Sequence, residues 1–399
     1  MRKACLFIFN ILLIIIFTGC TKNISNIEAL NENTYEGFSE SEINSAKINI
    51  DSVFTDLPSV LEKKYSNFLM PATITIDKGT LYSDIQLEQV SGFDEQAALV
   101  FKTLLGDFYT NDLKMETTEL VFSKGKTIDN KEKQIYAAVM DNGLVSFMKP
   151  AGYVIGFDES YDVIDTIYVD RGDALNETYE LSDGSESIQD ATDYVLNWIN
   201  KNWIPYEPDF DYHIKTVKIR KAGDHYMYEM LVEKWFEGIP LDDIMNTKNM
   251  VIDANSNMLI KDISSTLYIR MCSMNSVDVF SNGNGIIKVI GHTTEETGWL
   301  PLSSCMDMIS KLFTDFTIYD IKDIELKYVI TPDYTSLDPA QVRFNYKYPG
   351  IKMNAYPIWR FIIDKPDEQT DIAGIKNYHI DVNMRTGEVW FELDEKKTK

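Results

Sequence analysis

The side chains that could carry out a reaction are dispersed along this sequence. The histidines stand apart from one another and no His-Glu-x-x-His pair occurs, so the ligand spacing of zinc hydrolases is missing. The Gly-x-Ser-x-Gly elbow of serine hydrolases is also missing. We therefore expect no catalytic residue, no metal ligand and no cofactor, and we interpret the chain as a non-enzyme. The histidines are His213, His225, His292 and His379.

Carboxylates are abundant, but their spacing singles out no site. The run Asp253–Asn257 has the Asp-x-Asn-x-Asn spacing that begins a calcium loop, yet Met258 and Ser264 stand where that loop needs Gly and Glu. We expect a hairpin turn there, because Asn and Asp suit turns by themselves. Pairs such as Glu233 and Glu237 could serve glycoside hydrolysis. With 62 acidic residues in the chain, the sequence does not select a pair.

Two cysteines remain for disulfide chemistry once the N-terminal segment is set aside. Cys5 and Cys20 lie within that segment, which leaves Cys272 and Cys305. Two cysteines do not make a disulfide framework, although an exported location would permit a bridge. We favour two buried free thiols that behave as small apolar side chains, with the bridge as the alternative.

The first twenty residues carry the most specific signal. Arg2 and Lys3 precede an apolar run from Leu6 to Phe17, which ends in Thr18-Gly19-Cys20. A basic start, an apolar core shorter than a membrane span and small residues before a cysteine are typical of a bacterial lipoprotein signal peptide. We predict that residues 1–19 are the signal peptide. Cys20 would then be lipidated and would anchor the protein to the outer, extracytoplasmic face of the cell membrane.

Net charge limits the partners. Removal of Arg2 and Lys3 with the signal changes the formal charge from −24 to −26. So acidic a chain is repelled by nucleic acid and by anionic headgroups, which argues against nucleic-acid partners and against membrane contact beyond the lipid. The hydrophobic content of 44% is well above the disordered range, so most of the mature chain is expected to fold.

The elements predict an α+β fold built from two or three repeated modules. Residues 20–50 are polar and are expected to form a tether. Beyond them, a helix followed by antiparallel strands recurs in residues 51–180, 185–291 and 296–396. Each module is expected to pack a helix on an antiparallel sheet.

Apolar spacing locates the helices and alternation locates the strands. Helices are predicted over 52–69 and 93–108, from 187 to before Pro205, and from about 303. Strands are predicted over 135–140, 144–148, 153–157, 163–169, 212–220, 226–236, 250–252, 258–263, 324–330, 342–348, 358–363 and 378–391. Asn142-Gly143 predicts a hairpin with a type I′ turn.

Two segments resemble PepSY and thermolysin-propeptide domains. The first is Trp235–Leu241, of sequence WFEGIPL, with Val251-Ile252-Asp253 after it. The second is Tyr378–Val389, of sequence YHIDVNMRTGEV. The layout is also similar to uncharacterised lipoproteins of clostridial Gram-positive bacteria and, distantly, to the YycH and YycI regulators of a cell-wall kinase. The resemblance implies a non-catalytic protein that binds or inhibits another envelope protein, and it transfers no catalytic residue.

Aromatic and apolar residues are the candidate contacts for such a partner. We expect the contact at strand edges or at Trp235, Phe236 and Ile239, with Trp203 as a surface aromatic. The alternative hypothesis is a lipoprotein that captures a peptide or glycan ligand, or an undetected cell-wall hydrolase, with a cleft between modules as its site.

Overall fold

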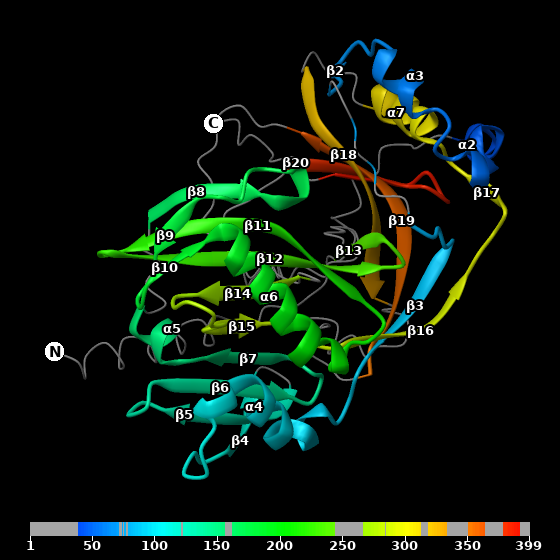
Figure 1. The fold of residues 1–399 in the computed structure, drawn as a ribbon. Helices are drawn as coiled ribbons and strands as arrows, with labels where there is room; N and C mark the ends of the chain where they lie inside the picture. Colours follow the sequence, from blue (N-terminus) through cyan, green and yellow to red (C-terminus); the bar gives the residue numbers. More distant parts are fainter. Residues whose placement is uncertain are drawn as a thin grey trace, which may run out of the picture.

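The computed structural model describes residues 39–71, 74, 76, 79–120, 123–155, 162–243, 266–283, 285–312, 318–332, 350–363 and 378–391. Over these residues the protein has a mixed α+β fold, mostly β-sheet with a few helices, as the sequence predicts (Figure 1). None of the helices in these ranges is long and apolar enough to cross a membrane.

Three of the predicted helices begin close to where apolar spacing places them. The α-helices are α2 (Glu40–Ala46), α3 (Leu57–Glu62), α4 (Ala97–Leu105), α5 (Pro150–Ile155), α6 (Ile188–Asn202) and α7 (Leu302–Leu312). The 3-10 turns are η2 (Ile50–Ser52), η3 (Phe93–Gln96), η4 (Gly106–Phe108), η5 (Val169–Arg171) and η6 (Ile204–Tyr206). The predictions near 93–108, 187 and 303 are confirmed. At the start of α6 the Asp190 N–H donates to the Ser187 hydroxyl at 3.0 Å, which satisfies a free helix-end donor.

The strands fall into three runs along the chain. The first run is β1 (Ile48–Asn49), β2 (Phe68–Leu69), β3 (Asp84–Gln89), β4 (Glu116–Leu120), β5 (Ser123–Asn130), β6 (Ile135–Met140), β7 (Val145–Met148) and β8 (Asp162–Tyr168). The second is β9 (Thr178–Glu180), β10 (Ser185–Ser187), β11 (Asp211–Ala222), β12 (His225–Phe236), β13 (Ile239–Asp243), β14 (Leu267–Met271) and β15 (Val279–Ser281). The third is β16 (Ile287–Thr293), β17 (Thr297–Trp299), β18 (Tyr319–Pro332), β19 (Lys352–Ile363), β20 (Tyr378–Asn383) and β21 (Val389–Phe391).

Three local predictions are wrong. The predicted tether is folded from Ser39 onward, because Ser39 and Glu42 form a reciprocal capping box that starts α2. Residues 153–155 of the strand predicted over 153–157 belong to α5, which begins at Pro150; so short an apolar run does not distinguish strand from helix. The predicted helix over 52–69 gives way to β2, because Phe68 stacks on Tyr319 of β18.

Antiparallel pairing joins strands from distant parts of the chain into one sheet. Its order is β8-β11-β12-β14-β15-β7-β6-β5-β4. A second group contains β16, β3, β19 and β18; β20 also pairs with β19, and β21 pairs with β20. The strand β13 forms a hairpin with β12 and pairs in parallel with β18, which connects the two groups.

These pairings cross the predicted module boundaries. The strands β7 and β8 of residues 51–180 pair with β15 and β11 of residues 185–291. The strand β3 pairs with β19 of residues 296–396. Alternation of apolar residues defines a strand but not its neighbour, which explains why the sequence does not predict these pairings.

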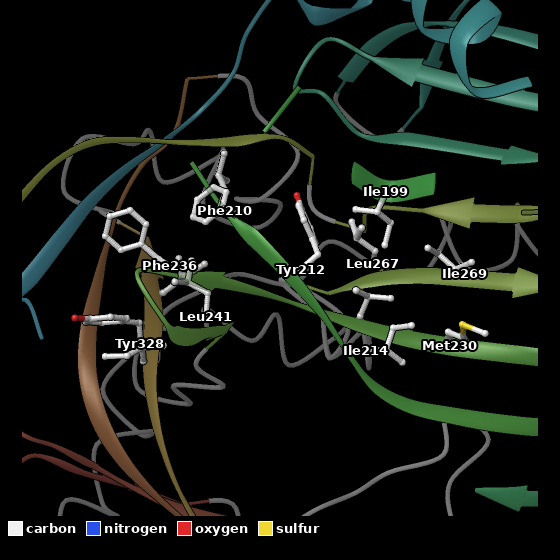
Figure 2. Packing of buried hydrophobic residues seen from close by; sticks show 14 of the residues in the cluster. Ile199, Phe210, Tyr212, Ile214, Met230, Phe236, Leu241, Leu267, Ile269 and Tyr328 are labelled. Atoms are coloured by element: carbon white, nitrogen blue, oxygen red, sulfur yellow. The ribbon is translucent and has the colours of Figure 1, made fainter. Parts of the chain in front are cut away.

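A single large apolar cluster runs through both groups of strands. Figure 2 shows part of it, where Ile199 of α6 faces Leu267 of β14. Phe147 of β7 and Phe280 of β15 are opposite each other in the ladder and their rings stack at 5.6 Å. The core therefore continues across the line where the first and second segments meet.

Candidate functional site

The segment that carries the family resemblance, Trp235–Leu241, is the hairpin between β12 and β13. Phe236 pairs with Ile239, so the turn has two residues, Glu237 and Gly238. Both have positive φ, 50° and 84°, as a type I′ turn requires. At the hairpin expected to have this turn, Asn142-Gly143, only Gly143 has positive φ. The Asn142 side chain there accepts the Leu144 N–H at 3.1 Å.

Three of the predicted partner contacts are buried, which corrects the prediction. Phe236 is 7% exposed, and Ile239 and Trp203 are fully buried. Phe236 lies against the rings of Tyr82, Phe210 and His292, which places it in the core. These side chains stabilise the fold and present no surface to a partner.

Trp235 alone among these residues is partly exposed. Its ring lies against the exposed imidazole of His213 in a tilted arrangement, with centroids 4.1 Å apart and an interplanar angle of 31°. The two side chains come from paired strands, β12 and β11. They form an aromatic pair on the surface of the sheet.

Trp203 is held by a buried network centred on Glu207. The Trp203 indole N–H donates to the Glu207 carboxylate at 2.8 Å, and the Tyr212 hydroxyl donates to the same oxygen. The Lys234 ammonium donates to the other oxygen at 2.7 Å, and the Ile287 backbone N–H reaches it at 3.2 Å. The apolar face of a helix predicts which residues are exposed only within the helix itself. Trp203 lies just beyond the end of α6, where the 3-10 turn η6 directs its side chain inward.

A row of buried charges crosses the strands that connect the two groups. The Lys327 ammonium lies 2.9 Å from a Glu233 oxygen and 3.1 Å from a Glu325 oxygen. Lys215 also donates to Glu233, at 2.8 Å. The row therefore joins β11 and β12 to β18 through side chains.

The row continues through Arg360 of β19. Its guanidinium donates two hydrogen bonds to the Asp381 carboxylate of β20, each at 2.8 Å, and a third to Asp242 of β13. The imidazole of His379 is 3.4 Å from Asp381. A bidentate guanidinium–carboxylate pair fixes both the distance and the angle between its strands.

The pKa values in this row follow from the pairing. Burial alone would lower the pKa of Lys327, but Glu233 and Glu325 hold it well above the usual value. Burial would raise the pKa of Asp381, yet Arg360 and His379 lower it to about 2. Each group is thus kept charged by its neighbours, as expected for a paired network.

A second polar cluster lies on β11, β12 and β14. Glu229 accepts from the Tyr268 hydroxyl at 2.7 Å and lies 2.9 Å from Arg220 and 3.0 Å from Arg270. Against the effect of burial, these donors lower the pKa of Glu229. The cluster compensates its own charges, so it offers no group suited to proton transfer.

Two exposed edges are capped by carboxylates. On β8 the Thr166 N–H donates to Asp165 at 2.7 Å, and the Tyr168 N–H donates to Asp173 at 2.8 Å. On β16 the Val289 N–H donates to Asp209 at 3.0 Å. Side chains that occupy edge donors protect against strand addition, which counts against these two edges as docking sites.

The cysteines are two buried free thiols, as we favoured. Burial and the carboxylate of Asp278 raise the pKa of Cys272 to about 12, and burial raises that of Cys305 well above its usual value. Because the thiolate is the nucleophile, neither residue is suited to covalent catalysis. Within the described residues no three His, Cys, Asp or Glu side chains gather as a metal site would need.

Several predicted features lie outside the described residues. They are Cys20, the turn at Asp253–Asn257, and the strands predicted over 250–252, 258–263 and 342–348.

The comparisons show the fold alone. No protein-family model matches the chain, and the search of curated proteins finds no match. The crystal structure of an uncharacterized protein from Eubacterium rectale ATCC 33656 is similar, with a TM-score of 0.52 and 12% sequence identity. The match covers 85% of this chain and 99% of that one. The arrangement of strands and helices therefore also occurs in a protein with a very different sequence.

Proposed function

We propose that this chain is a lipoprotein, anchored through Cys20 to the outer face of the cell membrane, that binds and regulates another envelope protein without catalysing a reaction. The observation that carries the proposal is the order of the first twenty residues, a basic start, an apolar run and Thr18-Gly19-Cys20. The buried, protonated thiols and the self-compensated charge clusters support a non-catalytic role.

We also propose that the fold contains PepSY-like repeats. The supporting observation is that a helix precedes an antiparallel run of four strands three times. The runs are α4 with β4-β5-β6-β7, α6 with β11-β12-β14-β15, and α7 with β18-β19-β20-β21. In the first two repeats the fourth strands, β7 and β15, pair with each other.

The surface pair Trp235 and His213 is the proposed contact for the partner. An aromatic side chain that is half-buried loses little freedom on binding and adds a large apolar area, which suits it as an anchor. Its buried neighbours Phe236 and Ile239 hold the hairpin in place without touching the partner.

Labelling and crosslinking in cells test the two parts of the proposal. Labelled palmitate should enter the wild-type protein and not the Cys20→Ala variant, which should leave the membrane fraction. Crosslinking should attach one dominant envelope protein, and Trp235→Ala should reduce that product. Tyr226→Ala is the matched control, because Tyr226 is also a half-buried aromatic residue of β12. Incorporation of palmitate into both the wild-type protein and Cys20→Ala would contradict the lipid anchor. Equal amounts of crosslinked product in Trp235→Ala and Tyr226→Ala would contradict the proposed contact.

A further inference from the structure

Two of the three most exposed large hydrophobic side chains of the described residues are neighbours. Ile318 is 64% exposed and Leu69 is 54% exposed. Phe68 and Leu69 form β2, which pairs in parallel with the start of β18, Phe68 with Tyr319 and Leu69 with Asp320. Single exposed aliphatic residues are common, but an adjacent pair of the most exposed ones calls for an explanation.

The local geometry directs both side chains outward. The rings of Phe68 and Tyr319 stack at 5.3 Å and are buried. Successive residues of a strand point to opposite faces, so Leu69 and Ile318 lie on the solvent side of the β2–β18 pair.

This pair lies at the end of the molecule where the chain leaves toward Cys20. The described chain begins at Ser39, directly before α2. Figure 1 shows α2, α3, α7 and β2 together at that end, and α3 packs on α7. A Cβ on Gly387 would touch Ile43 of α2 and Met308 of α7, which places those two helices side by side as well. The 19 residues from Cys20 to Ser39 reach at most about 65 Å when fully extended.

We propose that Leu69 and Ile318 dip into the headgroup boundary of the bilayer and so orient the anchored protein on the membrane. The inference rests on the proposed lipid anchor, which keeps this end within reach of the membrane. Two lysines near the pair supply no net attraction, because Lys63 pairs with Asp307 and Lys322 pairs with Asp320. The contact is therefore apolar, and neutral lipid is sufficient for it.

The acidity of the chain limits the contact to neutral lipid. Asp320 is opposite Leu69 in the β2–β18 pair and its side chain is 43% exposed, so it would lie within the screening length of about 8 Å from anionic headgroups. The net charge argues against membrane binding by a chain that is free in solution. A chain already anchored by lipid loses little further translational entropy when it makes a second, weak contact with the same membrane. Two partly exposed aliphatic side chains are enough to bias orientation under these conditions.

Fluorescence quenching on vesicles tests the inference without relying on lipidation in cells. The chain from Thr21 onward carries a hexahistidine tag in place of residues 1–20 and is held on phosphatidylcholine vesicles by a nickel-chelating lipid. An environment-sensitive probe is placed on Ile318→Cys and, as the control, on Lys131→Cys, which is exposed in the turn between β5 and β6 at the opposite end (Figure 1). The native Cys272 and Cys305 are buried, so the probe is expected to label position 318 or 131 selectively.

Nitroxide lipids should quench the probe at position 318 and leave the probe at 131 unquenched. Leu69→Ser, added to the labelled protein, should lower the ratio of docked to undocked protein about fivefold. Replacing part of the phosphatidylcholine with anionic lipid should not increase quenching.

Three results would overturn the inference. They are equal quenching at both probes, no quenching at 318, and a change at 318 only after addition of an envelope protein, which would make this pair a protein contact. None of them bears on whether Cys20 receives lipid in cells, so this inference and the proposed function fail separately.

Discussion

Removal of the Glu207 charge tests how the buried network stabilises the fold. Glu207 is fully buried and Lys234 is 1% exposed, so no water replaces a lost partner. Glu207→Gln keeps the volume and leaves the Lys234 ammonium without its counter-ion. Removing one partner of a buried ion pair costs about 3–5 kcal/mol, and we expect a loss of that size in the free energy of unfolding.

A double-mutant cycle separates the ion pair from the rest of the network. In Lys234→Met the carboxylate keeps the donors of Trp203, Tyr212 and Ile287. The coupling free energy between Glu207 and Lys234 is measured by urea unfolding of the chain from Thr21 onward. The unfolding is compared among the parent chain, the two single variants and the double variant. The double variant should cost less than the sum of the single variants by at least about 1.5 kcal/mol.

The exposed pair of Lys322 and Asp320 is the matched control. Its atoms are 2.6 Å apart, but its side chains are 45% and 43% exposed. The equivalent substitutions, Lys322→Met and Asp320→Asn, should show a coupling of at most about 0.5 kcal/mol, as surface pairs do. Additive losses at Glu207 and Lys234, or equal coupling in the two pairs, would refute the reasoning.

Three further predictions concern acid stability, thiol reactivity and one turn. Because Asp381 titrates at about 2 when folded and near 3.8 when unfolded, it contributes about 2 kcal/mol above pH 4 that is lost as the pH falls toward 2. Arg360→Met should remove that dependence in unfolding measured from pH 2 to pH 6. Cys272 and Cys305 should not react with a thiol reagent at pH 8 until the protein unfolds, and rapid reaction of the native protein would contradict their burial. Glu237→Asn should raise the free energy of unfolding by about 0.5–1 kcal/mol, because Asn tolerates the positive φ of this position better; a loss in thermal unfolding would count against it.

The sequence predicts elements well where one face is apolar and the other polar. The face of α6 with Ile188, Val195 and Ile199 is buried as the periodicity requires. Helical periodicity does not apply to Trp203, because it lies one residue past the end of α6. At that position the direction of the backbone decides whether the side chain is exposed. Burial of the β12–β13 hairpin depends on its parallel pairing with β18, about ninety residues away, which local sequence does not encode.

Part of the row of buried charges could have been predicted from the sequence. Arg360 stands between Trp359 and Phe361 in the otherwise apolar run from Ile358 to Ile363, whereas Lys327 follows Glu325 by two residues in an alternating pattern and gives no such signal. A cation inside an otherwise buried strand indicates a buried partner, because an unpaired charge there is very costly. The identity of the partner is not readable in this way, since Glu233 and Asp381 belong to strands that meet only in the fold.

The charged row also bears on the choice between a binding protein and a ligand-capture protein. The alternative hypothesis needs a cleft between the segments 185–291 and 296–396. At that boundary β13 pairs with β18, and Lys327 and Arg360 fill the space beside it with ion pairs to Glu233 and Asp242. Opening a cleft there would separate buried opposite charges, so a ligand would have to overcome their attraction before gaining any contact. A partner that uses the outer surface, at Trp235 and His213, meets no such cost, and this difference favours a binding protein.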